Sequence, residues 1–317
     1  CDGGRSVIRK AAGIEFPGWD PTVSHILAEA EIADEPTWGM RHDAIGIHGL
    51  SRMDDGKTVR IMVTERDVGR ADQPTLRDLS EGLIAHYCTD FGVHSPLHIS
   101  RFTDMARQAA SYRQGRVLLA GDAAHVHYPA GGQGLNLGVQ DAFNLGWKLA
   151  QVVKGISPDS LLDSYQAERH PVGALVLRNS LAQVALRRQD ERSKALAESV
   201  SALLRMEEPR KRFAGMMSGL DIQYDLGDGH PLVGRRMPDL DVVTAEGTRR
   251  VFTLMHSARP LLLSFNGPAK VDIGRWIDRV QVVNARFDGR WELPVIGEVS
   301  APIAALVRQD GYVVWVG

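Results

Sequence analysis

RVLLAGDAAHVHYPAGGQGLNLGVQDAFNLGWKLA, residues 116–150, joins an apolar strand to a long helix through a Gly-Asp pair and a glycine-rich turn. The strand would carry Gly121 and Asp122 to the edge of a sheet, where α/β proteins bind their ligands. A helix beginning near Gly134 would offer unpaired amides and a partial positive charge to an anion or an electron-rich carbonyl. The bend between them favours a ligand site over a turn that only reverses the chain.

The turn itself carries the residues that such a site needs. Pro129 fixes the direction of the chain, and Gly131 and Gly132 let the backbone approach a ligand closely. His125 and His127 precede the turn; without further ligands nearby, they predict packing or hydrogen bonding rather than a metal site. Beyond it, apolar residues with helical spacing predict one buried stripe, formed by Leu135, Val139, Ala142, Phe143, Gly146, Leu149, Ala150 and Val153.

Composition limits the classes of function. The 317 residues suffice for two domains, and a formal net charge of −2 gives no field that favours nucleic acid or an anionic membrane. No stretch approaches the ~20 apolar residues of a membrane span, and no secretory signal opens the chain. The two cysteines, Cys1 and Cys88, cannot form a disulfide framework or a zinc site, so we expect a cytoplasmic protein. Cys88 is expected to be buried and inert.

Upstream of the motif, the pattern predicts strands and one helix. Residues 44–65 form a predicted hairpin that turns at Asp-Gly, and its second arm alternates apolar Val59, Ile61 and Val63 with more polar positions. Strands are predicted near 24–33 and 96–102. A capped helix is predicted over 74–92, with Gly92 beyond its end and an apolar face made of Leu76, Leu79, Leu83 and Ile84.

Downstream, the pattern becomes helical and then mixed. Helices are predicted over 158–169 and 171–213, with Pro171 as the break. The run RRQDERSK (187–194) alternates in sign and indicates a solvated helix face rather than a nucleic-acid patch. Met206, Phe213, Met216 and Met217 are taken as ordinary core, with an apolar substrate cavity as the alternative. The tail alternates predicted strands over 259–265, 280–287 and 311–317 with a helix over 270–280.

Four stretches resemble one known family. GDAAHVHYPAGGQGLNLGVQDAFNLGWKLA resembles the second flavin motif of the FAD-dependent aromatic hydroxylases, the class A flavoprotein monooxygenases. CDGGRSVIRK (1–10) resembles the Asp-Gly motif of the same family, and ERHPVG (168–173) fits its following helix. SGLDIQYDLGDGHPLVGRRMPDL (218–240), followed by a thioredoxin-like tail, is similar to the branch of aromatic polyketide hydroxylases and rifampicin monooxygenases.

The resemblance implies a role for each matching residue. Asp122, after Gly121, would bind the ribitol or ribose region of FAD, and the turn Pro129–Gly134 would lie beside the pyrophosphate and the flavin ring. The amides of Leu135 and Asn136 would face the flavin C2 carbonyl, where negative charge develops on reduction. The motif at the start of the chain would contact the pyrophosphate region and assist NAD(P)H through Asp2, Gly3, Arg5 and Ser6. Arg5 and Arg9 as simple surface charges remain the alternative.

The resemblance also implies an activity. NAD(P)H would reduce FAD, molecular oxygen would add as a flavin C4a-hydroperoxide, and a phenolic or polycyclic aromatic substrate of the rifamycin or polyketide type would be hydroxylated. The cofactor carries this chemistry, so no acid–base triad is expected. Strands within 40–65 and 96–104 would form one wall of the substrate pocket. The alternative is a non-catalytic remnant or interaction module that binds no flavin.

The expected fold class is α/β (α+β), an incomplete Rossmann-like FAD domain with a mixed-sheet substrate region, long helices and a thioredoxin-like C-terminal domain. The Gly-x-Gly-x-x-Gly turn of the family is absent, so we expect the chain to be the carboxy-terminal portion of a longer protein that does not retain FAD by itself. The tail lacks Cys-x-x-Cys, which excludes thioredoxin-like redox chemistry. Its expected role is therefore packing or oligomerisation, such as the formation of a homodimer. The expected divisions are 1–20 with 106–157 (FAD domain), 21–105 (substrate sheet), 158–234 (helical) and 235–317 (tail).

Overall fold

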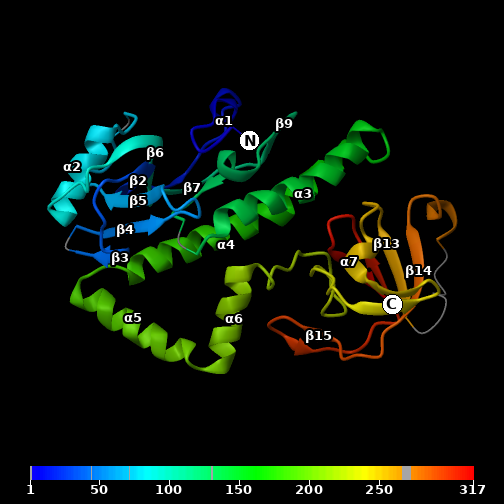
Figure 1. The fold of residues 1–317 in the computed structure, drawn as a ribbon. Helices are drawn as coiled ribbons and strands as arrows, with labels where there is room; N and C mark the ends of the chain where they lie inside the picture. Colours follow the sequence, from blue (N-terminus) through cyan, green and yellow to red (C-terminus); the bar gives the residue numbers. More distant parts are fainter. Residues whose placement is uncertain (1, 44, 71, 130, 266–272) are drawn as a thin grey trace.

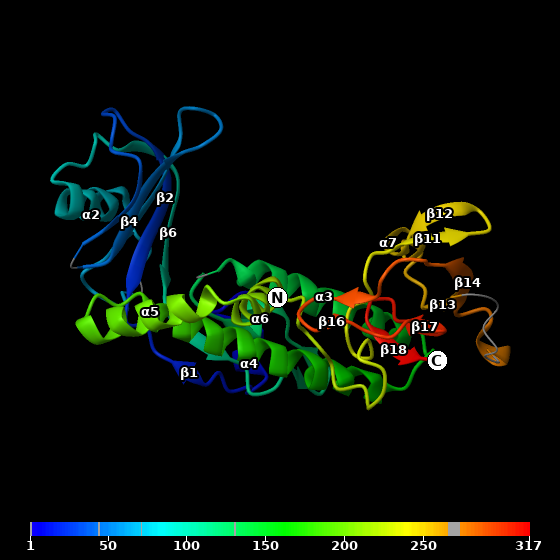
Figure 2. The same cartoon turned by 90° about the horizontal axis from the view of Figure 1, so that it is seen from below.

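The computed structural model describes residues 2–43, 45–70, 72–129, 131–265 and 273–317. A five-stranded sheet with helix α2 (Leu76–Tyr87) lies at one end of the molecule and a mixed sheet at the other. Between them run the long helices α3 (Gln133–Val153) and α4 (Asp163–Leu186), as Figure 1 and Figure 2 show. The mixture of helices and sheets is the α/β (α+β) class expected. None of the helices in the described ranges is both long and apolar enough to cross a membrane.

The five-stranded sheet confirms the predicted hairpin. Its strand order is β3-β4-β5-β2-β6, and all its pairings are antiparallel. Leu50 faces Ile61 across the hairpin, and the alternating apolar residues of the second arm are buried in a core beneath α2. The strands are β2 (Ser24–Glu31), β3 (Gly39–His42), β4 (Ile47–Arg52), β5 (Val59–Thr64) and β6 (His94–Thr103).

Helix α2 begins as predicted but ends differently. Thr75 and Asp78 form a capping box, in which each side chain accepts from the backbone of the other residue. The helix ends at Cys88, which adopts a left-handed conformation with φ 61° and is exposed, so the prediction of a buried cysteine is wrong. Ile84 is half exposed, so the predicted apolar face is narrower than the spacing indicated.

The motif region folds as a set of short strands ahead of α3. The small sheet β1-β7-β10 consists of antiparallel pairs, and the Gly-Asp pair itself forms a 3-10 turn over Gly121–Ala123. Helix α1 (Val7–Ala11) lies beside this region. The strands are β1 (Gly18–Trp19), β7 (Ala106–Gln108), β8 (Arg113–Gln114), β9 (Val117–Leu118) and β10 (His125–Val126).

Helix α3 buries the opposite face from the one predicted. The apolar stripe points away from the described residues, with Leu135 81% and Phe143 62% exposed. The buried face is mostly polar and consists of Gln133, Leu137, Asp141, Asn144 and Lys148. The prediction of a buried stripe is therefore wrong for this chain, because ion pairs to α4 and a hydrogen bond from Asn144 to Asp310 in the tail make burial of the polar face possible.

Helix α4 runs through Pro171 without a break, contrary to the prediction. A proline inside a helix removes one hydrogen bond at a cost of roughly 3 kcal/mol. Beside the proline, the Gln108 side chain donates to the carbonyl of His170 at 2.8 Å. The chain leaves the helix only after Leu186, and Asp190 then caps α5 (Glu191–Leu204), which is followed by α6 (Glu207–Ser218). The run 187–194 is largely exposed, and its first half is a link between helices.

The tail forms a mixed sheet of order β12-β11-β14-β13-β17-β18. A parallel pair, β13 and β14, is followed by antiparallel β17 and β18, as expected of a thioredoxin-like unit. Of the predicted helix 270–280, residues 270–272 lie outside the described ranges and the rest contains only a 3-10 turn, Gly274–Trp276. The elements are β11 (Asp241–Thr244), β12 (Gly247–Arg250), α7 (Val251–Leu254), β13 (Leu261–Phe265), β14 (Gln281–Arg286), β15 (Glu292–Leu293), β16 (Gly297–Glu298), β17 (Ala304–Val307) and β18 (Val313–Val316).

Candidate functional site

The motif at the start of the chain is tied to the Gly-Asp turn by one buried arginine. Arg9 donates from Nη1 to the carbonyl of Ala123 at 2.8 Å and from Nη2 to the carbonyl of Gly4 at 2.9 Å. It is therefore a structural residue and not the surface charge that was considered. A Cβ on Gly4 would come within 2.8 Å of Val126, so the two motifs pack closely. Sequence elements more than a hundred residues apart thus form one site.

The other residues of that motif surround the start of α1. Ser6 caps the helix and accepts from the amide of Arg9 at 2.9 Å. The Ser6 side chain, together with the amide of Ile8 at 3.1 Å, lowers the pKa of Asp2 to about 2, so this carboxylate is ionised at neutral pH. Gly3 has φ +80°, and Arg5 is exposed.

A buried acid on α3 holds the Gly-Asp turn in place. Asp141 accepts at Oδ2 from the amide of Gly121 at 3.1 Å and from His125 Nε2 at 2.6 Å, and at Oδ1 from Arg169 Nε at 2.8 Å. Burial alone would raise the pKa of Asp141, but His125 and Arg169 lower it below the usual range. Sequence analysis missed Asp141 and Arg169; the available signal was an acid inside a helix and an arginine within ERHP.

Two glycines bring α3 directly against the turn. Gly121 has φ +59°, a conformation that favours glycine, and a Cβ on Gly138 would lie 3.3 Å from the Gly121 Cα. The next residue, Asp122, is exposed, and its carboxylate has no hydrogen-bond partner among the residues that the structure describes. The acid that the sequence places at the sheet edge is therefore free to meet a ligand.

The start of α3 is open. Gly132, with φ +66°, is the N-cap and provides no side chain to bond the first amides. In a helix that starts there, the amides of Gln133, Gly134 and Leu135 have no partner within the helix. The amide of Asn136, which was expected to face a flavin together with that of Leu135, instead pairs with the Gly132 carbonyl. The Gln133 side chain donates instead to the carbonyls of Met216 and Met217, at 3.0 and 3.1 Å.

The rest of the predicted turn lies beside this helix start. Pro129 is exposed and accepts at its carbonyl from the amide of Gly132 at 3.2 Å. Ala130, between the two, is outside the described ranges. A Cβ on Gly131 would come within 2.2 Å of the Met217 side chain, so a larger residue there forces a rearrangement. Leu135 and Asn136 are both exposed, which leaves the helix start accessible.

The histidines of the motif make hydrogen bonds, as predicted. His127 Nδ1 lies 2.8 Å from the carbonyl of Tyr128. Within the described chain, the one histidine and carboxylate group with metal-like spacing lies elsewhere, at Asp43, His48 and His86. There the amide of Thr64 donates to His48 Nδ1, so the proton is on Nε2, which faces Asp43 at 3.1 Å. A protonated nitrogen cannot bind a metal ion, so this group is a hydrogen-bond cluster.

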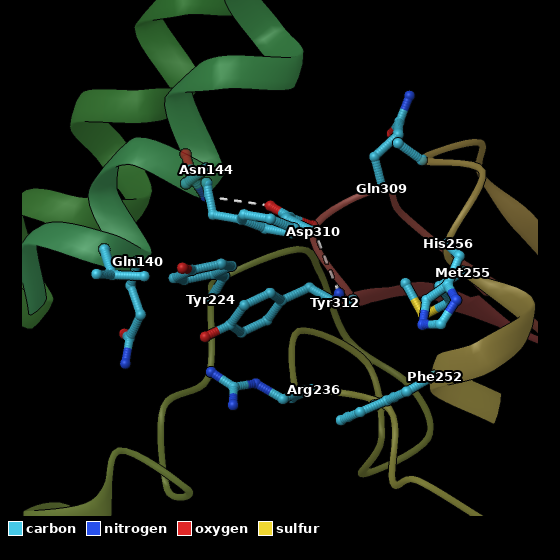
Figure 3. A pocket seen from close by; sticks show the side chains of 14 residues that line it. Gln140, Asn144, Tyr224, Arg236, Phe252, Met255, His256, Gln309, Asp310 and Tyr312 are labelled. Atoms are coloured by element: carbon cyan, nitrogen blue, oxygen red, sulfur yellow. Dashed lines mark hydrogen bonds between the residues drawn. The ribbon is translucent and has the colours of Figure 1, made fainter. Parts of the chain in front are cut away.

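Among the cavities lined by described residues, three adjoin α3 or the turn before it. One of about 590 Å³ lies between α3 and the tail, where Tyr224 stacks on Tyr312 with ring centroids 4.1 Å apart and Asn144 points toward Asp310 (Figure 3). One of about 290 Å³ lies between the five-stranded sheet and the turn before α3. The third, about 80 Å³, is lined in part by Met216 and Met217, whereas Met206 is largely exposed.

Comparison with known proteins identifies the family. The family described as "FAD binding domain" matches residues 1–180, more than half of the chain, and "Aromatic-ring hydroxylase, C-terminal" matches 230–317. The chain belongs to the FAD-binding aromatic-ring hydroxylases. The resemblance drawn from the sequence motifs is therefore confirmed, and the branch suggested by the tail agrees with the relatives described next.

Two curated relatives are each 43% identical. One is "12-dehydrotetracycline 5-monooxygenase/anhydrotetracycline 6-monooxygenase" from Streptomyces rimosus, matched over 99% of this chain and 65% of its own length. The other is "Rifampicin monooxygenase" from Streptomyces venezuelae, matched over 100% and 64%. A solved structure, OxyS anhydrotetracycline hydroxylase from Streptomyces rimosus, has TM-score 0.88 and 42% identity, over 100% of this chain and 64% of that one. The chain thus spans just under two thirds of these relatives.

Proposed function

We propose that the protein binds FAD at the start of α3 and acts as an NAD(P)H-dependent monooxygenase on a phenolic or polycyclic aromatic substrate. The observation that carries the proposal is the open helix start beside an exposed Asp122, in a chain whose family is defined by FAD binding. Free amides with a positive helix end are a fitting partner for a carbonyl or ring that gains negative charge.

The residues present fit one part of a flavin. The amides of Gln133, Gly134 and Leu135 would hold the flavin C2 carbonyl, and Asp122 would accept hydrogen bonds from ribitol or ribose hydroxyls. Asp2 and the motif around it would adjoin the pyrophosphate region, positioned by the buried Arg9. FAD supplies the redox chemistry in such an enzyme, accepting a hydride from NAD(P)H and activating oxygen.

The chain's own contribution would be position and charge. Asp141, bonded to Gly121 and Arg169, would keep the turn rigid, so its polar groups need no reorganisation when charge develops. The five-stranded sheet and the turn before α3 enclose a cleft of about 290 Å³, our candidate for the substrate side of the flavin. Anhydrotetracycline and rifampicin, named for the relatives, are the substrates to try first.

The chain is not expected to retain FAD through purification, so the first test is whether the purified protein binds added FAD. Titration with FAD, followed by quenching of flavin fluorescence, should saturate for the wild type and weaken at least about tenfold in Asp122→Ala, since a lost hydrogen bond from a charged group is worth about 1.5–3 kcal/mol. Asp67→Ala, which removes an exposed carboxylate from a loop, is the matched control. No binding at saturating FAD would support the non-catalytic alternative and contradict the proposal.

The second test concerns the reaction. With FAD, NADPH or NADH and either candidate substrate under ¹⁸O₂, the product should gain one oxygen atom derived from molecular oxygen. Incorporation from H₂¹⁸O instead, or consumption of the nicotinamide with no oxygenated product from any aromatic substrate, would refute the monooxygenase assignment.

A further inference from the structure

The cleft beside the five-stranded sheet contains a tyrosine and a histidine that the proposed function does not use. His25 is near the start of β2, and Tyr128 immediately precedes the turn to α3; both line the cleft of about 290 Å³. Each is more than nine-tenths buried, and Tyr128 Oη lies 3.1 Å from His25 Nε2. Such a buried pair has a definite proton arrangement, and the neighbouring bonds determine it.

Thr64 determines the protonation of His25. A threonine hydroxyl has one proton and two lone pairs. The amide of Ile47 donates to Thr64 Oγ1 at 3.0 Å, and the Thr64 proton goes to the Ile47 carbonyl at 2.8 Å, because a carbonyl only accepts. His25 Nδ1, 3.1 Å from the same Oγ1, must therefore be a donor, which places the ring proton on Nδ1.

This tautomer in turn determines the direction of the tyrosine hydroxyl. A neutral ring protonated at Nδ1 has a lone pair at Nε2, so Tyr128 must donate its proton to His25. Burial lowers the pKa of His25 to about 4 even with Asp104 nearby, so the ring is neutral at neutral pH. The ring is also held by stacking on Phe102, with centroids 5.0 Å apart. The Tyr128 oxygen then has lone pairs but no proton to offer to the cleft, where the guanidinium of Arg187 also lies beside it.

We propose that Tyr128 is a specificity-determining residue that accepts a hydrogen bond from a hydroxyl of the aromatic substrate, and that His25 and Thr64 are positioning residues that fix this polarity. The inference rests on the proposed function, since it assigns the substrate to this cleft. A phenolic or enolic hydroxyl can donate to the tyrosine oxygen, whereas a methyl ether has no proton to donate and should bind about tenfold or more weakly. A hydrogen bond from the phenol to Tyr128 also draws the phenolic proton away from its oxygen, which leaves the ring more electron-rich and suits attack on an electrophilic oxygen.

The binding test uses 1-naphthol and 1-methoxynaphthalene as probes. The wild type should bind 1-naphthol at least about tenfold more tightly than the ether, and Tyr128→Phe should lose that preference. Tyr87→Phe is the control, because its buried hydroxyl has no hydrogen-bond partner in the described chain and it does not line the cleft. No saturable binding of 1-naphthol, or equal affinity of wild type and Tyr128→Phe for it, would overturn the proposal.

A second measurement needs no ligand. Nitrogen NMR of ¹⁵N-histidine-labelled protein should show His25 protonated at Nδ1. In Thr64→Val, which should remain folded, His25 should lose its preference for this tautomer. An Nε2-protonated His25 in the wild type would overturn the inference. FAD titration separates the two proposals: the naphthol preference without FAD binding refutes only the function, and FAD binding without the preference refutes only the role of Tyr128.

Discussion

Replacing Glu168 by Gln should strongly destabilise the protein. Glu168, on α4, is 7% exposed and accepts from Arg308 Nη1 at 2.7 Å and Nη2 at 2.8 Å. It also accepts from Asn144 Nδ2 at 2.6 Å and lies 3.0 Å from Lys148 Nζ. Asp310 pairs with Arg308 at 2.7 Å, so two carboxylates balance two cations where α3, α4 and the tail meet.

The magnitude follows from this charge balance. With Gln at 168, Arg308 and Lys148 share the single carboxylate of Asp310, and one positive charge is left uncompensated in a buried site. Removing one partner of a buried ion pair costs about 3–5 kcal/mol, whereas an exposed pair contributes about 0–1 kcal/mol. Combining Glu168→Gln with Lys148→Met removes one charge of each sign and should recover a large part of the loss.

Urea unfolding monitored by tryptophan fluorescence measures the effect. Trp147 is a local reporter, because its Nε1 donates to Asp310 at 3.1 Å and Arg308 lies over its ring. Glu81→Gln, which breaks the exposed pair with Arg77, is the control and should change the unfolding free energy by less than about 1 kcal/mol. A Glu168→Gln loss as small as the control's, or a double variant no more stable than the single one, would refute the reasoning.

Three further predictions follow from the same helices. Burial lowers the pKa of Lys148 from 10.5 to about 8, so the unfolded chain binds this proton more tightly than the folded one. The free energy of unfolding should therefore rise between pH 8 and 10.5, by at most about 3 kcal/mol. The urea midpoints of Lys148→Met should lack this rise. Gly138→Ala, which brings a Cβ within 3.3 Å of Gly121, should weaken FAD binding in a fluorescence titration. Gly146→Ala, which places its Cβ in open space, should leave FAD binding unchanged and raise the free energy of unfolding by up to about 1 kcal/mol. Equal FAD affinities of the two variants would contradict this prediction. Asp141→Asn should cost about 3–5 kcal/mol in urea unfolding by leaving the buried Arg169 without its carboxylate, and a wild-type midpoint would count against the bracing role of Asp141.

Local sequence patterns predicted the elements whose environment is local. The alternation in residues 59–63 was enough to place the hairpin and its buried side, because a strand in a half-covered sheet buries every second residue. The glycine-rich turn predicted where α3 starts, because backbone geometry there depends on the glycines themselves. The flavin motif was recognisable for the same reason: its chemistry lies in consecutive backbone groups.

The partners of those groups could not be predicted from spacing. Apolar residues that recur every 3.6 positions mark a possible apolar face on α3. They do not tell which face of the helix the rest of the chain covers, and in this structure the covered face is the polar one. Asp141, His125 and Arg169 belong to separate elements, and only the packing of α3 on α4 and the Gly-Asp turn brings their side chains together. Sequence alone determined where the chain turns and where a helix with free first amides begins. The tertiary structure decided which charges are buried, because burial of a charge depends on a partner from elsewhere in the chain.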